Sequence, residues 1–376
     1  MKKKILEFIK QETVLIVACV LAMVSIFFVT PDKKYIEYID FRTLGILFSL
    51  MALMAGFQNM GVFEEISRKL LNKMQSVRQL VIMLTLLCFF FSMIITNDVA
   101  LITFVPFTFV LFDMLGEETE KKWLIPVTIL QTIAANLGSM LTPIGNPQNL
   151  YLYGKSGMAF KEFICLILPY VSLSFLMLLI SSFIIGTIGN KKISVNLTQN
   201  NNKKIIYKVI TYIILFCICV LSVLRIISVG IAFAVTLCTI IIIDRKVLKK
   251  VDYSLLLTFV GFFIFIGNIG RLPMFSSLLE KYISGNEVVI SVLASQCVSN
   301  VPTALLLSNF TSNLPALIIG TNIGGLGTLI ASMASLISYK FIAQKKNIST
   351  GKYVFYFSVV NIIFLVVLML MYVIIN

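Results

Sequence analysis

The stretch NLGSMLTPIGNPQNLYLYG, residues 136–154, decides the fold of this chain. Prolines, glycines and polar side chains interrupt an apolar run here: Gly138, Ser139, Thr142, Pro143, Gly145, Asn146, Pro147, Gln148 and Asn149. A continuous helix is costly through such a stretch, because proline removes a backbone donor and glycine disfavours the helix. Residues 124–137 alone are too short to cross a hydrocarbon core of about 30 Å. We therefore predict a broken helix, whose unwound backbone is buried or lines a cavity.

The composition indicates that lipid is the main solvent. Of 376 residues, 59% are hydrophobic and 13% are charged, whereas soluble domains carry roughly 25% charged residues. Apolar runs of membrane-spanning length recur along the chain, and backbone polar groups in lipid must be satisfied within each segment. We predict an all-α polytopic membrane protein. The net charge of +14 comes from short basic clusters between apolar runs, so the expected partner is the lipid bilayer and not nucleic acid.

The lysines and arginines predict the topology. The expected spans are residues 14–30, 42–60, 123–150, 162–187, 207–224, 227–243, 252–268, 315–342 and 353–375. With the N-terminus inside, most of the 31 basic residues fall on the cytoplasmic side. The positive-inside rule therefore predicts a cytoplasmic N-terminus and an external C-terminus in the cytoplasmic membrane.

The same map predicts two inverted-topology repeats. Residues 1–187 form the N-terminal repeat, in which two helices precede an inward hairpin (79–115), the broken helix (123–150) and a further helix. Residues 188–206 are a cytoplasmic linker. Residues 207–376 repeat the order with reversed direction, using an outward hairpin (286–313) and a broken helix (315–342). Such repeats with discontinuous helices are typical of secondary transporters.

The first hairpin carries Thr96, Asn97 and Asp98 in an otherwise apolar stretch. An aspartate at the membrane centre costs about 2.5–3.5 kcal/mol on insertion scales, so Asp98 should face a cavity or a cation and not lipid. The alternative is two complete spans with Asp98 in an outer loop.

Each polar interruption of the second half has an alternative interpretation. Ser299, Asn300 and Thr303 flank Pro302, which could expose carbonyls for a cation or simply kink a packed helix. Thr321 and Asn322 lie in the glycine-rich GTNIGG, which could also serve close helix packing. Together the interruptions predict one shared site near the midplane, where helix N-termini favour an anion and freed carbonyls suit Na⁺.

The segments TNDVALITFVP (96–106) and LTPIGNPQNLYLY (141–153) resemble the ion transporter superfamily. The resembling members are citrate-transporter-like permeases, divalent anion/sodium symporters and arsenite-pump membrane proteins. The resemblance implies that substrate binds at Thr96, Asn97, Ser299, Asn300 and Thr303. It implies that Na⁺ binds at the first unwound loop, at Thr142, Gly145, Asn146 and Asn149. From the residues themselves we expect a cation to bind or couple at Asp98, Thr321 and Asn322 as well.

The chain departs from the symporters at Asp98, where they carry a neutral threonine, and at GTNIGG (320–325), which resembles arsenite-pump or sodium/proton-exchanger relatives. We therefore expect a secondary transporter for a small anion such as citrate, a dicarboxylate or an inorganic oxyanion, coupled to Na⁺ or H⁺ without a cofactor. The alternatives are an arsenite efflux permease, a Na⁺/H⁺ antiporter or a channel. A homodimer is expected.

Enzymatic activity is not expected, because the chain has no histidine and one deeply placed carboxylate, too few groups for a hydrolase. No GxxxxGK[ST] motif occurs in the sequence. An ATP-driven arsenite pump would therefore need a separate ATPase subunit.

Overall fold

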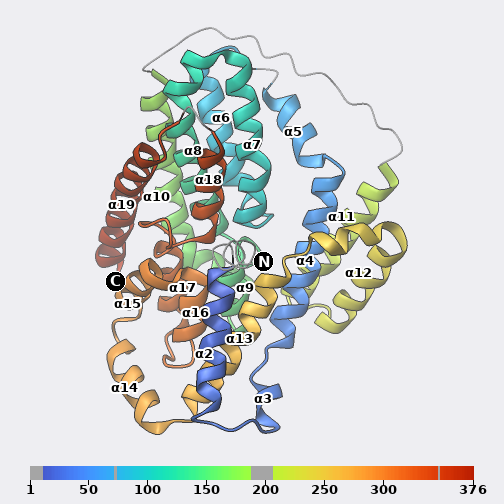
Figure 1. Cartoon of the computed structure of the whole chain (residues 1–376), viewed down its shortest axis with the longest axis vertical. Coiled ribbons are helices and arrows are strands. Elements are labelled where there is room, and N and C mark those ends of the chain that lie inside the picture. The colour runs from blue at the N-terminus through green and yellow to red at the C-terminus, as the bar shows by residue number, and fades with distance from the viewer. Residues whose placement is uncertain (1–11, 72–73, 188–205, 346–347) are drawn as a thin grey trace, which may run out of the picture.

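The computed structural model describes residues 12–71, 74–187, 206–345 and 348–376. Every element within these ranges is a helix, so the chain is an all-α polytopic membrane protein (Figure 1). Six of the described helices are long and apolar enough to cross a membrane: α4 (Phe41–Asn59), α7 (Asn97–Leu115), α10 (Phe160–Thr187), α11 (Ile206–Val223), α13 (Tyr253–Gly270) and α19 (Thr350–Ile375).

All of these helices except α7 coincide with expected spans. Two further expected spans, 14–30 and 227–243, contain the shorter helices α2 (Thr13–Ile26) and α12 (Val229–Asp244). The remaining short elements are α3 (Lys34–Glu37), α5 (Val62–Leu71), η2 (Arg245–Lys250) and α14 (Pro273–Ile283). Of the predicted linker 188–206, all but the last residue lies outside the described residues.

Each segment expected as a hairpin or as a broken helix contains two helices. In the first half these are α6 (Val77–Phe91), α7, α8 (Glu117–Ser139) and α9 (Pro147–Ser156). In the second half they are α15 (Glu287–Val298), α16 (Asn300–Leu307), α17 (Leu314–Ile323) and α18 (Met333–Gln344). Arm α7 is long enough to cross a membrane by itself. Its first residue nevertheless lies at the expected hairpin tip.

The helix starts have local causes in the sequence. Asp40 accepts a hydrogen bond from the Thr43 N–H ahead of α4, and Asp252 accepts one from the Leu255 N–H ahead of α13. These are N-caps, which satisfy one of the free donors of the first turn. Asn146 caps α9 in the same way and is followed by Pro147, whose fixed φ suits a first helical position.

The helices form two packed groups. The first, the α4 bundle, contains α2, α4, α11, α12 and α13: α2 packs on α13, and α4 packs on α11 and α12. The second, the hairpin bundle, contains α6–α10 and α15–α19, with α8 in contact with α6, α7, α10, α18 and α19. The bundles meet mainly where α13 contacts α16 and α4 contacts α9 (Figure 1). Each bundle therefore combines helices from both halves of the chain.

Candidate functional site

The tip of the first hairpin is held by the unwound part of the first broken helix. The N–H of Asn97 donates to the carbonyl of Gly145 at 3.1 Å. The Asn97 side-chain amide donates to Asn136 Oδ1 at 3.0 Å, and the hydroxyl of Thr142 donates to the Met93 carbonyl. Asn97 is buried against these neighbours. Thr96, which precedes α7, makes no side-chain cap.

The tip of the second hairpin is held in the corresponding way. The N–H of Asn300 donates to the carbonyl of Ala331, in the unwound stretch between α17 and α18, at 3.0 Å. Ser299 is 2% exposed and has φ 75° and ψ 154°, a region that is essentially restricted to glycine. Its carbonyl accepts the hydroxyl of Thr303 at 2.8 Å. A strained backbone maintained by its surroundings is typical of functional sites.

The two tips lie at one small cavity of about 10 Å³, which is formed where helices from both halves begin. In this state it has room for about one water molecule. Its walls include the first residues of four helices: Asn97 and Asp98 of α7, Pro147 and Gln148 of α9, Asn300 and Val301 of α16, and Met333 of α18 with the preceding Ser332. Asn136 stands beside it and accepts hydrogen bonds from Asn97 and from the Ser332 hydroxyl, each at 3.0 Å. The structure therefore brings Asn97 and Asn300 to the same cavity.

Three amides connect the two broken helices directly. Asn146 Nδ2 donates to Asn322 Oδ1 at 3.2 Å, and Asn322 Nδ2 donates to Asn149 Oδ1 at 2.6 Å. Asn146 Oδ1 in turn accepts the N–H of Asn149 at 2.9 Å. Each of the three side-chain oxygens, expected to serve a cation, thus already accepts a hydrogen bond from the protein. The hydroxyl of Thr321 donates to the Leu317 carbonyl of its own helix at 2.8 Å, and its oxygen can still accept.

Close backbone contact explains two of the glycines. A Cβ on Gly138 would lie 2.0 Å from the Phe89 carbonyl oxygen of α6, and a Cβ on Gly324 would lie 2.6 Å from Ser295 Oγ of α15. Glycine is the residue that permits such an approach of backbone. In both halves the broken helix therefore lies directly against the first arm of the neighbouring hairpin.

Asp98 faces a second cavity as well, on the side of α4 and α13. This cavity of about 130 Å³ has Gln58, Asp98, Lys250 and Asp252 among its polar lining residues. Asp98 Oδ1 is buried without a hydrogen-bond partner, whereas Lys250 donates to Asn59 and Asp252 caps α13. A buried, unpartnered carboxylate oxygen beside a second carboxylate is suited to bind a cation or a proton.

Sequence reasoning missed Gln58, Lys250 and Asp252. It treated Lys250 as a topology signal at a helix end, and nothing local connects any of the three residues to Asp98. It also missed Gln296 of α15, whose side-chain amide donates to the carbonyls of Gly324 and Leu326 at 3.1 and 3.0 Å and so supports the second unwound stretch. A glutamine three residues before the polar SNVPT motif was the available signal.

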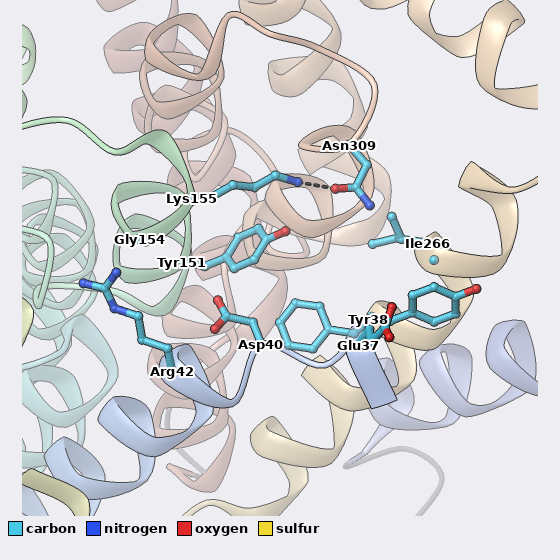
Figure 2. A pocket seen from close by; sticks show the side chains of 11 residues that line it. Glu37, Tyr38, Asp40, Arg42, Tyr151, Gly154, Lys155, Ile266 and Asn309 are labelled. Carbon is cyan, nitrogen blue, oxygen red and sulfur yellow. Dashed lines mark hydrogen bonds between the residues drawn. The ribbon is translucent and has the colours of Figure 1, made fainter. Parts of the chain in front are cut away.

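A third cavity, of about 400 Å³, lies at the other end of α9 (Figure 2). Lys155 and Tyr151 project into it from α9, with Asp40 and Asn309 nearby. Lys155 donates to Asn309 and, at 3.1 Å, to Ser308 Oγ, which also lies 2.8 Å from the Tyr151 hydroxyl. The cavity that contains Asp98 is lined by Pro147 and Leu150, from the first part of α9. Helix α9 thus lies between the two cavities.

Several known proteins with similar sequences are named as transporters. A family profile described as citrate transporter (CitMHS) matches residues 5–315. The chain is 32% identical over 333 residues to an uncharacterized transporter of Methanocaldococcus jannaschii. This alignment covers 88% of each protein. It is 30% identical over 335 residues to the inner membrane protein YbiR of Escherichia coli, covering 86% of this chain and 85% of that protein. A shorter match, 30% identical over 147 residues, joins 39% of this chain to 29% of the silicon efflux transporter LSI3 of Oryza sativa.

The extent of these matches agrees with the architecture. The profile covers both hairpins and the first broken helix, and two relatives align over most of their own length. A bundle of membrane-spanning helices around broken helices is the frame that such transporters use. The chain is a multi-pass membrane transporter and belongs to the citrate transporter family.

Proposed function

We propose that this protein is a secondary active transporter that moves a small anion, such as citrate, a dicarboxylate or an inorganic oxyanion, across the cytoplasmic membrane. The observation that carries the proposal is the convergence of four helix N-termini, those of α7, α9, α16 and α18, on one cavity. Each N-terminus carries a partial positive charge of roughly +0.5 e, which attracts an anion.

The side chains at this cavity add directional donors. Asn97 and Asn300, one from each hairpin tip, would donate their amides to oxygens of the substrate, as the resemblance to the symporters implies. Thr96, Ser299 and Thr303 would complete or position this set. Because the tips belong to different halves of the chain, movement of either hairpin would change the site, as alternating access requires.

A cation is the proposed partner of Asp98. The unpartnered Oδ1 and the nearby Asp252 form a negative wall between the anion cavity and the α4 bundle. Na⁺ or H⁺ would neutralise Asp98 and so allow an anion to bind next to it, which couples the two movements. The carbonyl-rich turns at Thr142 and Gly145 are the other candidates for Na⁺.

Efflux of an uncharged hydroxide, as in the arsenite alternative, is the second candidate. Asp98 favours it, because a fixed negative charge repels a dianion but not a neutral molecule. The similarity of part of the chain to a silicon efflux transporter agrees with this candidate. Na⁺/H⁺ antiport would instead use Asp98 alone. A separate ATPase subunit and a homodimer remain expectations.

Transport by the purified protein in liposomes tests these functions. We expect saturable uptake of one of citrate, succinate or sulfate under an inward Na⁺ or proton gradient. Asn97→Ala and Asn300→Ala should each lower kcat/KM by about tenfold or more, since a hydrogen bond to a charged group contributes about 1.5–3 kcal/mol.

The matched control is Asn361→Ala, which removes a buried asparagine of α19 that bonds only within its own helix. Its transport should stay near that of the parent protein. Arsenite transport without uptake of any anion would favour the second candidate. Equal losses in all three variants would argue against the shared site.

A further inference from the structure

The four helices that begin at the small cavity of the hairpin tips, here called the tip cavity, are also joined at their far ends. Two of them, α9 and α18, follow the unwound stretches of the broken helices, and the other two, α7 and α16, are the second arms of the hairpins. A lysine at the end of α9 contacts the end of α16, and a lysine at the end of α18 contacts the corner between α7 and α8. Each lysine therefore joins a broken helix of one half to a hairpin of the other half.

Lys155 makes the first of these contacts. It is the second-last residue of α9, and its ammonium donates to Ser308 Oγ at 3.1 Å and to Asn309 Oδ1 (Figure 2). Ser308 directly follows α16, and its hydroxyl also lies 2.8 Å from the hydroxyl of Tyr151, one turn earlier in α9. Between Pro147 at the tip cavity and Lys155, α9 rises by about 12 Å. The contact therefore fixes the end of α9 that is remote from the cavity.

Lys345 makes the second contact. It directly follows α18, about 18 Å along the helix from Met333 at the tip cavity. Its ammonium pairs with Glu120 of α8 at 2.7 Å and with Asp113 of α7, and it lies 5.7 Å from the ring centroid of Phe109. The side chain of Glu120 is 12% exposed and that of Asp113 is 50% exposed. Water therefore screens the pair with Asp113 more strongly, and Glu120 is the main partner.

At the tip cavity the same four helices are joined in the other combination. The N–H of Asn97 in α7 donates to the carbonyl of Gly145, two residues ahead of α9. The N–H of Asn300 in α16 donates to the carbonyl of Ala331, two residues ahead of α18. The four helices therefore form a closed ring, in which each is joined to one neighbour at the cavity and to another at its far end.

We propose that Lys155 and Lys345 are positioning residues for the tip cavity. Each fixes the far end of a short broken-helix segment, so that the first turn of this segment stays at the cavity. Helices α9 and α18 have 10 and 12 residues, so one strong contact restricts much of the freedom of each. A hairpin that moves during transport would carry the attached segment of the other half with it. This role in transport rests on the proposed anion site, whereas the positioning itself does not.

Hydrogen–deuterium exchange of the purified full chain without substrate, measured by mass spectrometry, tests the positioning. The Asn300 N–H reports on α18 and the Asn97 N–H reports on α9, because the acceptor of each lies just ahead of that helix. Lys345→Gln should speed exchange at Asn300 about tenfold, since a hydrogen bond to a charged group is lost and local opening becomes easier. Lys155→Gln should speed exchange at Asn97 in the same way.

Two kinds of control separate positioning from general stability. Lys345→Arg and Lys155→Arg should exchange like the parent protein, because arginine can donate to the same oxygens. Asp113→Asn removes the exposed partner only, and Glu120 still holds Lys345, so this variant should leave the exchange at both reporting N–H groups near the parent rates.

An unchanged rate at the reporting N–H would reject the role of the corresponding lysine. Faster exchange only beside the substituted lysine, or equally along the whole chain, would show a merely stabilising contact and also reject it. If Lys345→Gln does not elute as a folded species in size-exclusion chromatography, Glu120→Gln replaces it, and an unchanged rate at Asn300 in that variant rejects the contact. Because no substrate is used, these outcomes are independent of whether the protein transports an anion.

Discussion

Asp98 is the residue whose surroundings differ most from those of an ordinary membrane-embedded side chain. It is the second residue of α7, it lines two cavities, and one of its oxygens has no hydrogen-bond partner. An unpaired charge at this depth would be costly, and we propose a transported cation as its counter-charge. The neighbouring carboxylate Asp252 strengthens this inference, because two close carboxylates attract a cation more than one does.

Asp98→Asn should therefore abolish or reshape the dependence of transport on Na⁺ or pH, because asparagine keeps the volume and removes the charge. Transport in proteoliposomes under varied Na⁺ and proton gradients measures this. Asp113→Asn is the matched control on the same helix. Asp113 pairs with Lys345 and its side chain is half exposed, so its loss should have little effect. An unchanged cation dependence in Asp98→Asn would assign Asp98 a structural role at the hairpin tip.

At the scale of elements, hairpins and broken helices depend on each other. Each hairpin tip completes its backbone hydrogen bonds on an unwound stretch, through Asn97 to Gly145 and Asn300 to Ala331. An unsatisfied buried backbone group costs about 1–3 kcal/mol. The hairpin tips therefore stabilise the unwound stretches, and the unwound stretches stabilise the hairpin tips.

Gly138→Ala should disrupt this arrangement. The added methyl would lie 2.0 Å from the Phe89 carbonyl oxygen, so α6 and α8 must separate, at a typical overpacking cost of about 1–3 kcal/mol. We expect a lower midpoint of thermal unfolding in detergent. Gly230→Ala in α12 is the control, since nothing lies within 4 Å of its added carbon, and it should be neutral or slightly stabilising. Equal midpoints for Gly138→Ala and the parent protein would contradict the close contact.

At the scale of the whole molecule, the two bundles each contain helices from both halves, and the cavities on either side of α9 lie along their boundary. A site at such a boundary could be reached from either side of the membrane if the bundles shift. The orientation of the whole molecule then decides which cavity faces the cytoplasm. The basic clusters predict that the Lys250 end does.

Cysteine labelling of intact cells measures this orientation. In a variant without native cysteines, Asn376→Cys should react with an impermeant maleimide, while Lys246→Cys should react only after permeabilisation. Both positions are exposed in the structure, so accessibility does not limit the reaction. Labelling of position 246 but not 376 in intact cells would reverse the topology. Labelling of both without permeabilisation would contradict the predicted inverted repeat.

The sequence by itself determined the class of protein and the positions at which polar interruptions end one helix and begin the next. These features depend on local chemistry: apolar runs of membrane length, and prolines, glycines and polar residues that no continuous helix tolerates at low energy. For the same reason the tip residues Asn97, Asp98 and Asn300 were identifiable, because polar groups in apolar runs are conspicuous one at a time.

Only the tertiary structure decided what these residues face. The convergence of four helix starts, the pairing of Asn146 and Asn149 with Asn322, and the approach of Asp252 to the cavity of Asp98 join segments more than 100 residues apart. It also showed that amides expected to bind a cation already bond to one another. Sequence periodicity describes which side of a helix is apolar, but the contacts between distant polar groups depend on how the helices pack, and that packing is a property of the whole chain.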